Sequence, residues 1–242
     1  MKASAAAAAL ACQLAVPLIA ADSSQALPMS FEGSTTIGVE LDHIWSSAWF
    51  SHAVQRQLGV GISAQLIPGS GDHGESQHTH GSSHQNHGTS ELNSTESFLL
   101  LDSTHLLKRW NMNRAQSNLW LFAGVGTYQS WNNGRVNETR MAARPGLQFD
   151  IENTRLRFEA KGQLFLAQGV ERSMLSATTG IGLTPPRYEG VQPWLELQVR
   201  SMPGVIHEVE VIPKLRLLHR KVVLDVGYSS LGSLTGSVTT TF

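Results

Sequence analysis

Apolar and polar residues alternate along most of this chain, in short segments that turn residues separate. The pattern is clearest in residues 155–164, where Arg, Glu, Lys and Gln alternate with Leu, Phe, Ala and Gly, and residues 140–150 and 208–217 repeat it. Successive side chains of a β-strand point to opposite faces, so each segment has one apolar and one polar face. The alternation therefore predicts an all-β protein.

Counting these segments predicts about twelve strands, an even number as in single-chain bacterial barrels. Ten strands is the alternative, because residues 46–55 and 98–101 do not alternate cleanly. We predict one antiparallel up-and-down barrel with strands at 34–42, 46–54, 57–67, 94–107, 118–128, 137–150, 155–167, 172–184, 192–201, 207–218, 221–229 and 234–242.

Alternation alone does not say which face of the sheet is outside. A soluble, lipocalin-like barrel would bury the apolar face, whereas a membrane barrel turns it to lipid and must close, because an open edge leaves backbone amides unpaired. The start of the chain favours the membrane: Lys2 precedes an apolar segment, 3–21, with a cleavage site after Ala26, as in a secretory signal peptide. We therefore predict a signal peptide at 1–26 and a transmembrane β-barrel at 27–242.

The last predicted strand, 234–242, alternates polar and apolar residues and stops at the aromatic Phe242. In an exported protein this ending resembles the closing strand of Gram-negative outer-membrane β-barrel proteins. The resemblance implies that the barrel-assembly machinery recognises Phe242. It also implies that the protein lies in the bacterial outer membrane, in contact with lipid and lipopolysaccharide.

Tryptophan and tyrosine residues fall near the predicted strand ends, where membrane barrels carry interfacial girdles of aromatic side chains. This placement agrees with strands that cross a membrane. The outer ends would carry Trp45, Tyr128, Trp131 and Tyr228, and the inner ends Trp110, Trp120, Tyr188, Trp194 and Phe242.

The composition narrows the possible partners. Charged residues make up 15% of the chain, below the roughly 25% of soluble domains, and a net charge of -1 gives no electrostatic reason to expect nucleic acid. After residues 3–21, no apolar run approaches the roughly 18 residues of a spanning helix. The only cysteine, Cys12, lies in the predicted signal peptide, so the mature protein would have neither a disulfide nor a thiolate site.

Half of the ten histidines lie in one predicted extracellular loop, 68–93. Neutral imidazole is a good ligand for Zn and Cu(II), so this loop is a candidate metal site. It lacks a fixed ligand spacing such as HExxH, and the alternative is a solvated polar loop that binds no metal. The candidate metal ligands are His73, His78, His80, His84 and His87.

The polar faces of the predicted strands supply a second candidate site, in the lumen of the barrel. Both signs of charge are mixed there, which fits either a solute channel or a narrow barrel filled by salt bridges. The predicted lumen residues are Glu40, Asp42, Arg140, Arg144, Arg157, Glu159, Lys161, Glu196, Arg200, Glu208, Glu210, Lys214 and Arg216.

These features favour a non-catalytic barrel, with no catalytic residues and no cofactor other than possible Zn or Cu ions. We expect a small channel or surface protein for transition-metal binding, uptake or tolerance, in which lumen acids would lead the metal inward. A structural envelope barrel without a metal role is the alternative. A lipid-modifying enzyme is a third possibility, for which Ser103 and His105 share a strand face beside Asp102, although no Gly-x-Ser-x-Gly motif occurs.

Overall fold

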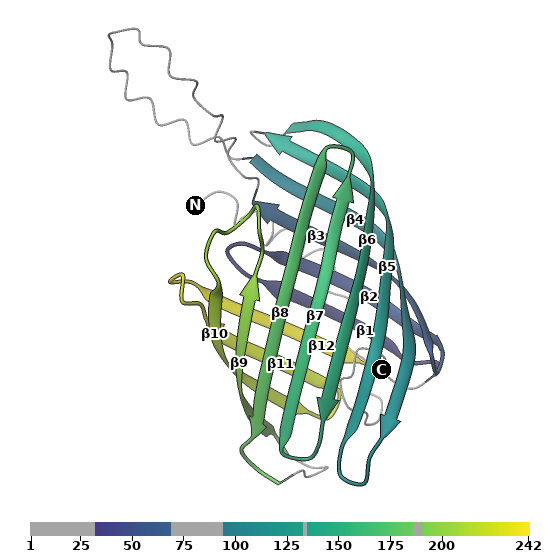
Figure 1. Cartoon of the computed structure of the whole chain (residues 1–242), viewed down its shortest axis with the longest axis vertical. Coiled ribbons are helices and arrows are strands. Elements are labelled where there is room, and N and C mark those ends of the chain that lie inside the picture. Colours follow the sequence, from purple (N-terminus) through teal and green to yellow (C-terminus); the bar gives the residue numbers. More distant parts are fainter. Residues whose placement is uncertain (1–31, 69–93, 133–134, 186–189) are drawn as a thin grey trace, which may run out of the picture.

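The computed structural model describes residues 32–68, 94–132, 135–185 and 190–242, which form one closed antiparallel barrel of twelve strands (Figure 1). This confirms the predicted twelve-strand barrel, and the ten-strand alternative is wrong. The strands are β1 Thr35–Leu41, β2 Ser46–Gln55, β3 Leu58–Pro68, β4 Ser94–Asn111, β5 Gln116–Asn132, β6 Arg135–Glu152, β7 Leu156–Ala167, β8 Val170–Gly182, β9 Gln192–Ser201, β10 Glu210–His219, β11 Val222–Tyr228 and β12 Leu234–Thr241.

Each strand pairs with its neighbours in sequence, and β1 closes the barrel against β12. The register places Val39 opposite Val238. At the end of this seam Thr35 and Phe242 exchange two backbone hydrogen bonds, of 2.8 and 2.9 Å. Closure satisfies the backbone groups that an open edge would leave unpaired.

No helix long and apolar enough to cross a membrane occurs in the described part of the chain.

The two faces of the sheet have the polarity of a membrane barrel. Outward-facing Leu101 and Met141 are 63% and 76% exposed, whereas inward-facing Asp150 and Arg200 are 4% and 2% exposed. A soluble barrel would show the reverse, so the lipocalin-like alternative is wrong. An apolar outer face around a polar interior is the pattern of transmembrane β-barrels.

Three strands are longer than the sequence predicts. β4, β5 and β6 have 18, 17 and 18 residues, and the connection predicted at 108–117 shrinks to 112–115. β10 in contrast begins at Glu210, three residues later than predicted. Glu208 therefore lies exposed in the connection 202–209, and its prediction as a lumen residue is wrong.

The predicted aromatic girdle is wrong for several residues. Trp45, Trp120 and Tyr128 are 4%, 0% and 3% exposed inside the barrel, and Trp194 lies in the inward row of β9 with Glu196. Large rings fill space in the interior of a barrel of this size. Trp110, Tyr228 and Phe242 are exposed, and Tyr188 lies outside the described residues.

Candidate functional site: the barrel interior and its mouth

One end of the barrel, here called the mouth, carries the connections 42–45, 168–169, 202–209 and 229–233. Strand β3 ends and β4 begins at this same end. The predicted histidine-rich loop would join them, and its residues 69–93, with all five candidate ligands, lie outside the described residues. The described interior therefore contains the remaining candidate site.

Salt bridges run along the inner wall from β7 to β11. The guanidinium of Arg157 contacts Glu159 at 2.5 Å and Glu196 at 3.1 Å. Arg216 contacts the same Glu196 at 3.1 Å and Asp225 at 2.7 Å. Each buried charge in this network is therefore paired with a side chain of opposite charge, which offsets the cost of removing it from water.

A second ion pair joins β6 and β4, between Arg144 and Asp102 at 2.8 Å. It passes over Gly124 on β5, where a Cβ atom would lie 2.4 Å from the Asp102 carboxylate. Only glycine leaves room for this contact, so the residue type at position 124 allows two strands to bond across a third.

Charged side chains of the inner face that have no salt bridge among the described residues include Glu40, Glu152, Lys161 and Lys214. The ammonium nitrogen of Lys161 lies 5.4 Å from the ring centroid of Phe122. Its electrostatic neighbours include Glu159 on its own strand and Glu40 on β1, which stands opposite β7 in the strand order. The interior is therefore narrow enough for charges on opposite walls to interact.

Several buried polar atoms of the inner face have no hydrogen-bond partner in the described protein. They are Gln65 Oε1, Arg144 Nε, Gln148 Nε2 and Gln198 Oε1. Buried polar groups that lack a protein partner bind water in folded proteins. These atoms indicate a hydrated interior.

A third network lies toward the end opposite the mouth. The carboxylate of Asp150 accepts hydrogen bonds from the side chains of Asn118 and Trp120, both at 2.7 Å. Arg109 in turn donates to the Asn118 oxygen at 2.7 Å. Because Asn118 and Trp120 are fully buried, this network ties β5 to β6 from the inside.

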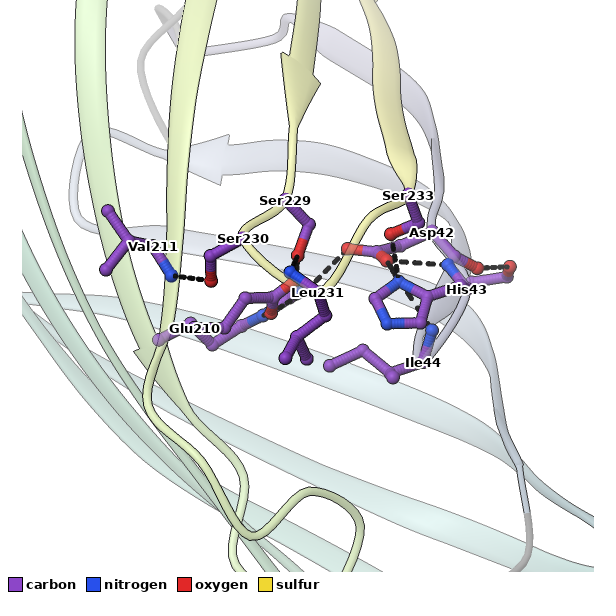
Figure 2. Close-up of polar contacts among 11 residues, drawn as sticks. Asp42, His43, Ile44, Glu210, Val211, Ser229, Ser230, Leu231 and Ser233 are labelled. Atoms are coloured by element: carbon purple, nitrogen blue, oxygen red, sulfur yellow. Dashed lines mark hydrogen bonds and ion pairs between the residues drawn. The ribbon is translucent and has the colours of Figure 1, made fainter.

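At the mouth, six side chains form a polar cluster. Figure 2 labels five of them, Asp42, His43, Glu210, Ser229 and Ser233, and the sixth is Arg200. Arg200 contacts Asp42 at 2.5 Å and Glu210 at 2.6 Å, and all three side chains are at most 2% exposed. The Ser229 hydroxyl donates to the other oxygen of Glu210. His43 Nδ1 contacts both Asp42 Oδ1, at 2.7 Å, and Ser233 Oγ, at 2.5 Å.

Asp42, His43 and Glu210 have ligand atoms within 4.8 Å of one another, which is close enough for a metal ion. The Arg200 guanidinium, however, already contacts both carboxylates and supplies the positive charge. A Ser-His-Asp relay does not form either, because a relay uses both ring nitrogens and here Ser233 and Asp42 contact the same one. This cluster fits a structural role.

The predicted lumen residues fall into separate groups. Asp42, Arg200 and Glu210 meet in the polar cluster, and the remaining strand residues lie on the inner wall described above. Arg140 lies at the rim, where it contacts Glu138 at 2.5 Å and the carbonyl of Gln168 in the β7–β8 turn. The predicted row of acids leading inward is not formed, because Asp42 and Glu210 share Arg200 and Glu208 is outside.

The residues considered for lipid hydrolysis do not assemble. Ser103 donates to the carbonyl of Ala123 on the outer face of β4. Asp102 points to the inner face, because neighbouring residues of a strand alternate, and it pairs there with Arg144.

Sequence reasoning missed an apolar layer inside the mouth. Ile44 and Trp45 from one connection, and Met202 from another, are at most 7% exposed. Together with inward-facing residues of six strands, β3 to β8, they form one cluster, here called the apolar plug. These residues are Ile67, Phe98, Leu100, Tyr128, Ala142, Phe165 and Met174, with Val205 and Ile206 packed against them.

The architecture and the polarity of its faces define a protein of the transmembrane β-barrel class. No family model and no curated protein matches the chain. Among solved structures it is similar to the KdgM porin, with 10% identity and a TM-score of 0.45 over 86% of this chain and 98% of that chain. The KdgM porin in complex with disordered oligogalacturonate matches with 9% identity, the same TM-score and the same coverage.

Proposed function

We propose that this protein is a non-enzymatic channel of the bacterial outer membrane, which passes small polar or charged solutes through its interior. The observation that supports the proposal best is the inner wall, on which charged side chains of both signs continue from the mouth to the opposite end. We place the mouth on the extracellular side, where the long connection between β3 and β4 would lie.

The mixed charge of the interior argues for weak ion selectivity. Rings of one sign favour one ion, whereas the salt bridges of Arg157 and Arg216 cancel most of the wall charge. The unpaired charges then decide the preference. Lys161 is the most central of these, because its neighbours include residues on both β1 and β4.

Replacing Lys161 by glutamate is expected to shift the selectivity toward cations. The change removes one positive charge and adds a negative one beside Glu159 and Glu40, so the permeability ratio of K⁺ to Cl⁻ should rise on the order of tenfold. Reversal potentials of the refolded protein in planar bilayers under a KCl gradient would measure it.

Arg155→Glu is the matched control, because Arg155 is exposed in the turn between β6 and β7 and the charge change is the same. Its reversal potential should stay near that of the unsubstituted protein. Equal shifts in both variants would place the selectivity outside the lumen, and the absence of any conductance would contradict the channel.

We also propose a second function, binding of Zn or Cu at the mouth by the histidine-rich loop. The supporting observation is compositional: His73, His78, His80, His84 and His87 lie within a short Gly- and Ser-rich segment. In a barrel that passes solutes, such a loop would concentrate metal ions at the entrance.

Titration with Zn(II) and Cu(II) tests this function, beside a variant that lacks residues 72–88. We expect micromolar or tighter binding that disappears with the deletion, and weaker binding below about pH 6, where histidines become protonated. Equal binding by both proteins, or none, would show that the loop has no metal role.

A further inference from the structure

We infer that the connections 42–45 and 202–209 form a closed gate, whose apolar side chains exclude water from the mouth and which the polar cluster holds in place. This inference rests on the proposed channel function, because a gate requires a pore that conducts.

The apolar plug reaches across the whole barrel. Trp45 follows β1, and its ring lies 5.2 Å from that of Phe165 on β7, the strand opposite β1 in the closed order. Phe165 also lies 5.4 Å from Phe98 on β4, and Phe98 lies 5.2 Å from Tyr128 on β5. These contacts connect opposite walls through aromatic rings, so little room is left for water or solute.

Both connections are folded inward by local structure. Asp42 Oδ1 accepts the backbone amides of His43, at 2.6 Å, and of Ile44, at 3.5 Å. The bond to Ile44, two residues on, is an Asx-type contact, which turns the chain before Trp45. In the other connection, Gly204 has φ of 83°, and the amides of Val205 and Ile206 bond to the Met202 carbonyl at 3.0 Å. Apolar side chains in these turns therefore face the interior.

Ion pairs then fasten the plug from two sides. Arg200, near the end of β9, holds Asp42, the first residue of one connection, and Glu210, which directly follows the other. Arg172 on β8 contacts Glu96 on β4 at 2.7 Å, across the interior, and approaches Gly204. Because both connections depend on Arg200, loss of its ion pairs would release them together.

Hydrophobic constrictions close pores to ions without filling them completely, because water leaves a narrow apolar passage. The interior beyond the plug is polar, with Gln65 and Arg144 carrying unpaired buried atoms. An apolar layer at one end of a polar interior is therefore placed to stop conduction at that end.

The test compares two triple serine variants in planar bilayers. The plug variant carries Ile44→Ser, Met202→Ser and Ile206→Ser. The control variant carries Met112→Ser, Leu183→Ser and Val191→Ser, which are exposed residues of connections at the opposite end. We expect the open fraction of the plug variant to rise at least several-fold, with the control unchanged.

A second readout reports closure without conduction. Leu100→Cys, in a Cys12→Ser background, places a thiol at a plug position that is 1% exposed. A water-soluble maleimide should react slowly with it in the otherwise native protein and at least several-fold faster when the plug serines are added. Heat-modifiable gel migration would establish that each variant is folded.

These readouts separate the two proposals. Conductance and labelling that do not respond to the plug serines overturn the gate, and if the protein still conducts, the channel function stands. If labelling becomes faster but no variant conducts, the plug closes the mouth as inferred, and the proposed channel function is wrong. Labelling of the plug variant could also rise while its conductance stays equal to that of the control. The plug would then exclude water without limiting conduction, and this result overturns the gate.

Discussion

Replacing Arg200 by alanine is expected to lower the free energy of unfolding by about 3–5 kcal/mol, the cost of breaking a buried ion pair by removing one partner. The guanidinium is 2% exposed and serves two carboxylates, Asp42 and Glu210, which are equally buried. Without it, two negative charges would remain next to each other away from water. Urea unfolding of the refolded barrel, followed by tryptophan fluorescence, would measure the loss.

The control for this prediction removes the charges together. Arg200→Met combined with Asp42→Asn and Glu210→Gln leaves no uncompensated charge, and such replacements of buried ion pairs are often close to neutral. We therefore expect the triple variant to recover most of the lost stability. A triple variant as unstable as Arg200→Ala would mean that side-chain packing, and not charge, makes Arg200 important.

Replacing Trp120 by alanine should cost a similar amount, about 3–5 kcal/mol, because it empties the space of a fully buried indole ring. Trp120→Phe keeps most of the ring and removes only the hydrogen bond to Asp150. Since that bond ends on a carboxylate, its loss should cost about 1.5–3 kcal/mol. Urea unfolding of the two variants would separate packing from hydrogen bonding.

Trp110→Phe provides the comparison on the same hairpin. Trp110 is 36% exposed, and its ring contacts Phe149 and Lys108, which phenylalanine can retain. Its unfolding free energy should change by no more than about 0.5 kcal/mol, as for most surface substitutions. Equal losses in both Trp→Phe variants would contradict a specific role for the Asp150 network.

The alternation of residues was enough to predict the strands whose two faces differ in polarity. In β7, Arg157, Glu159 and Lys161 face the interior as predicted, because the neighbouring apolar residues must face outward when the period is two. Glu208 was wrongly predicted to lie in the lumen because the alternation of residues continues into the connection before β10. Only the pairing of β10 with β9, which begins at Glu210, shows where the strand starts.

The plug is the clearest case in which the pattern did not reveal the structure. Residues 98–101 read Phe-Leu-Leu-Leu, because Phe98 and Leu100 pack inside the plug while Leu99 and Leu101 face outward. A strand that is apolar on both faces loses its alternation. The same strand also carries Glu96 and Asp102, whose roles in the interior the sequence reading missed.

The sequence by itself determined the all-β class and the division of most strands into a polar and an apolar face, because both follow from local periodicity. It left ten and twelve strands as alternatives, and the structure decided for twelve. The tertiary structure decided which charges meet and what closes the mouth. Arg200 and Asp42 are 158 residues apart in the chain, and Trp45 and Phe165 lie on opposite walls. Such contacts depend on barrel closure and strand register, and local sequence patterns do not predict either of them.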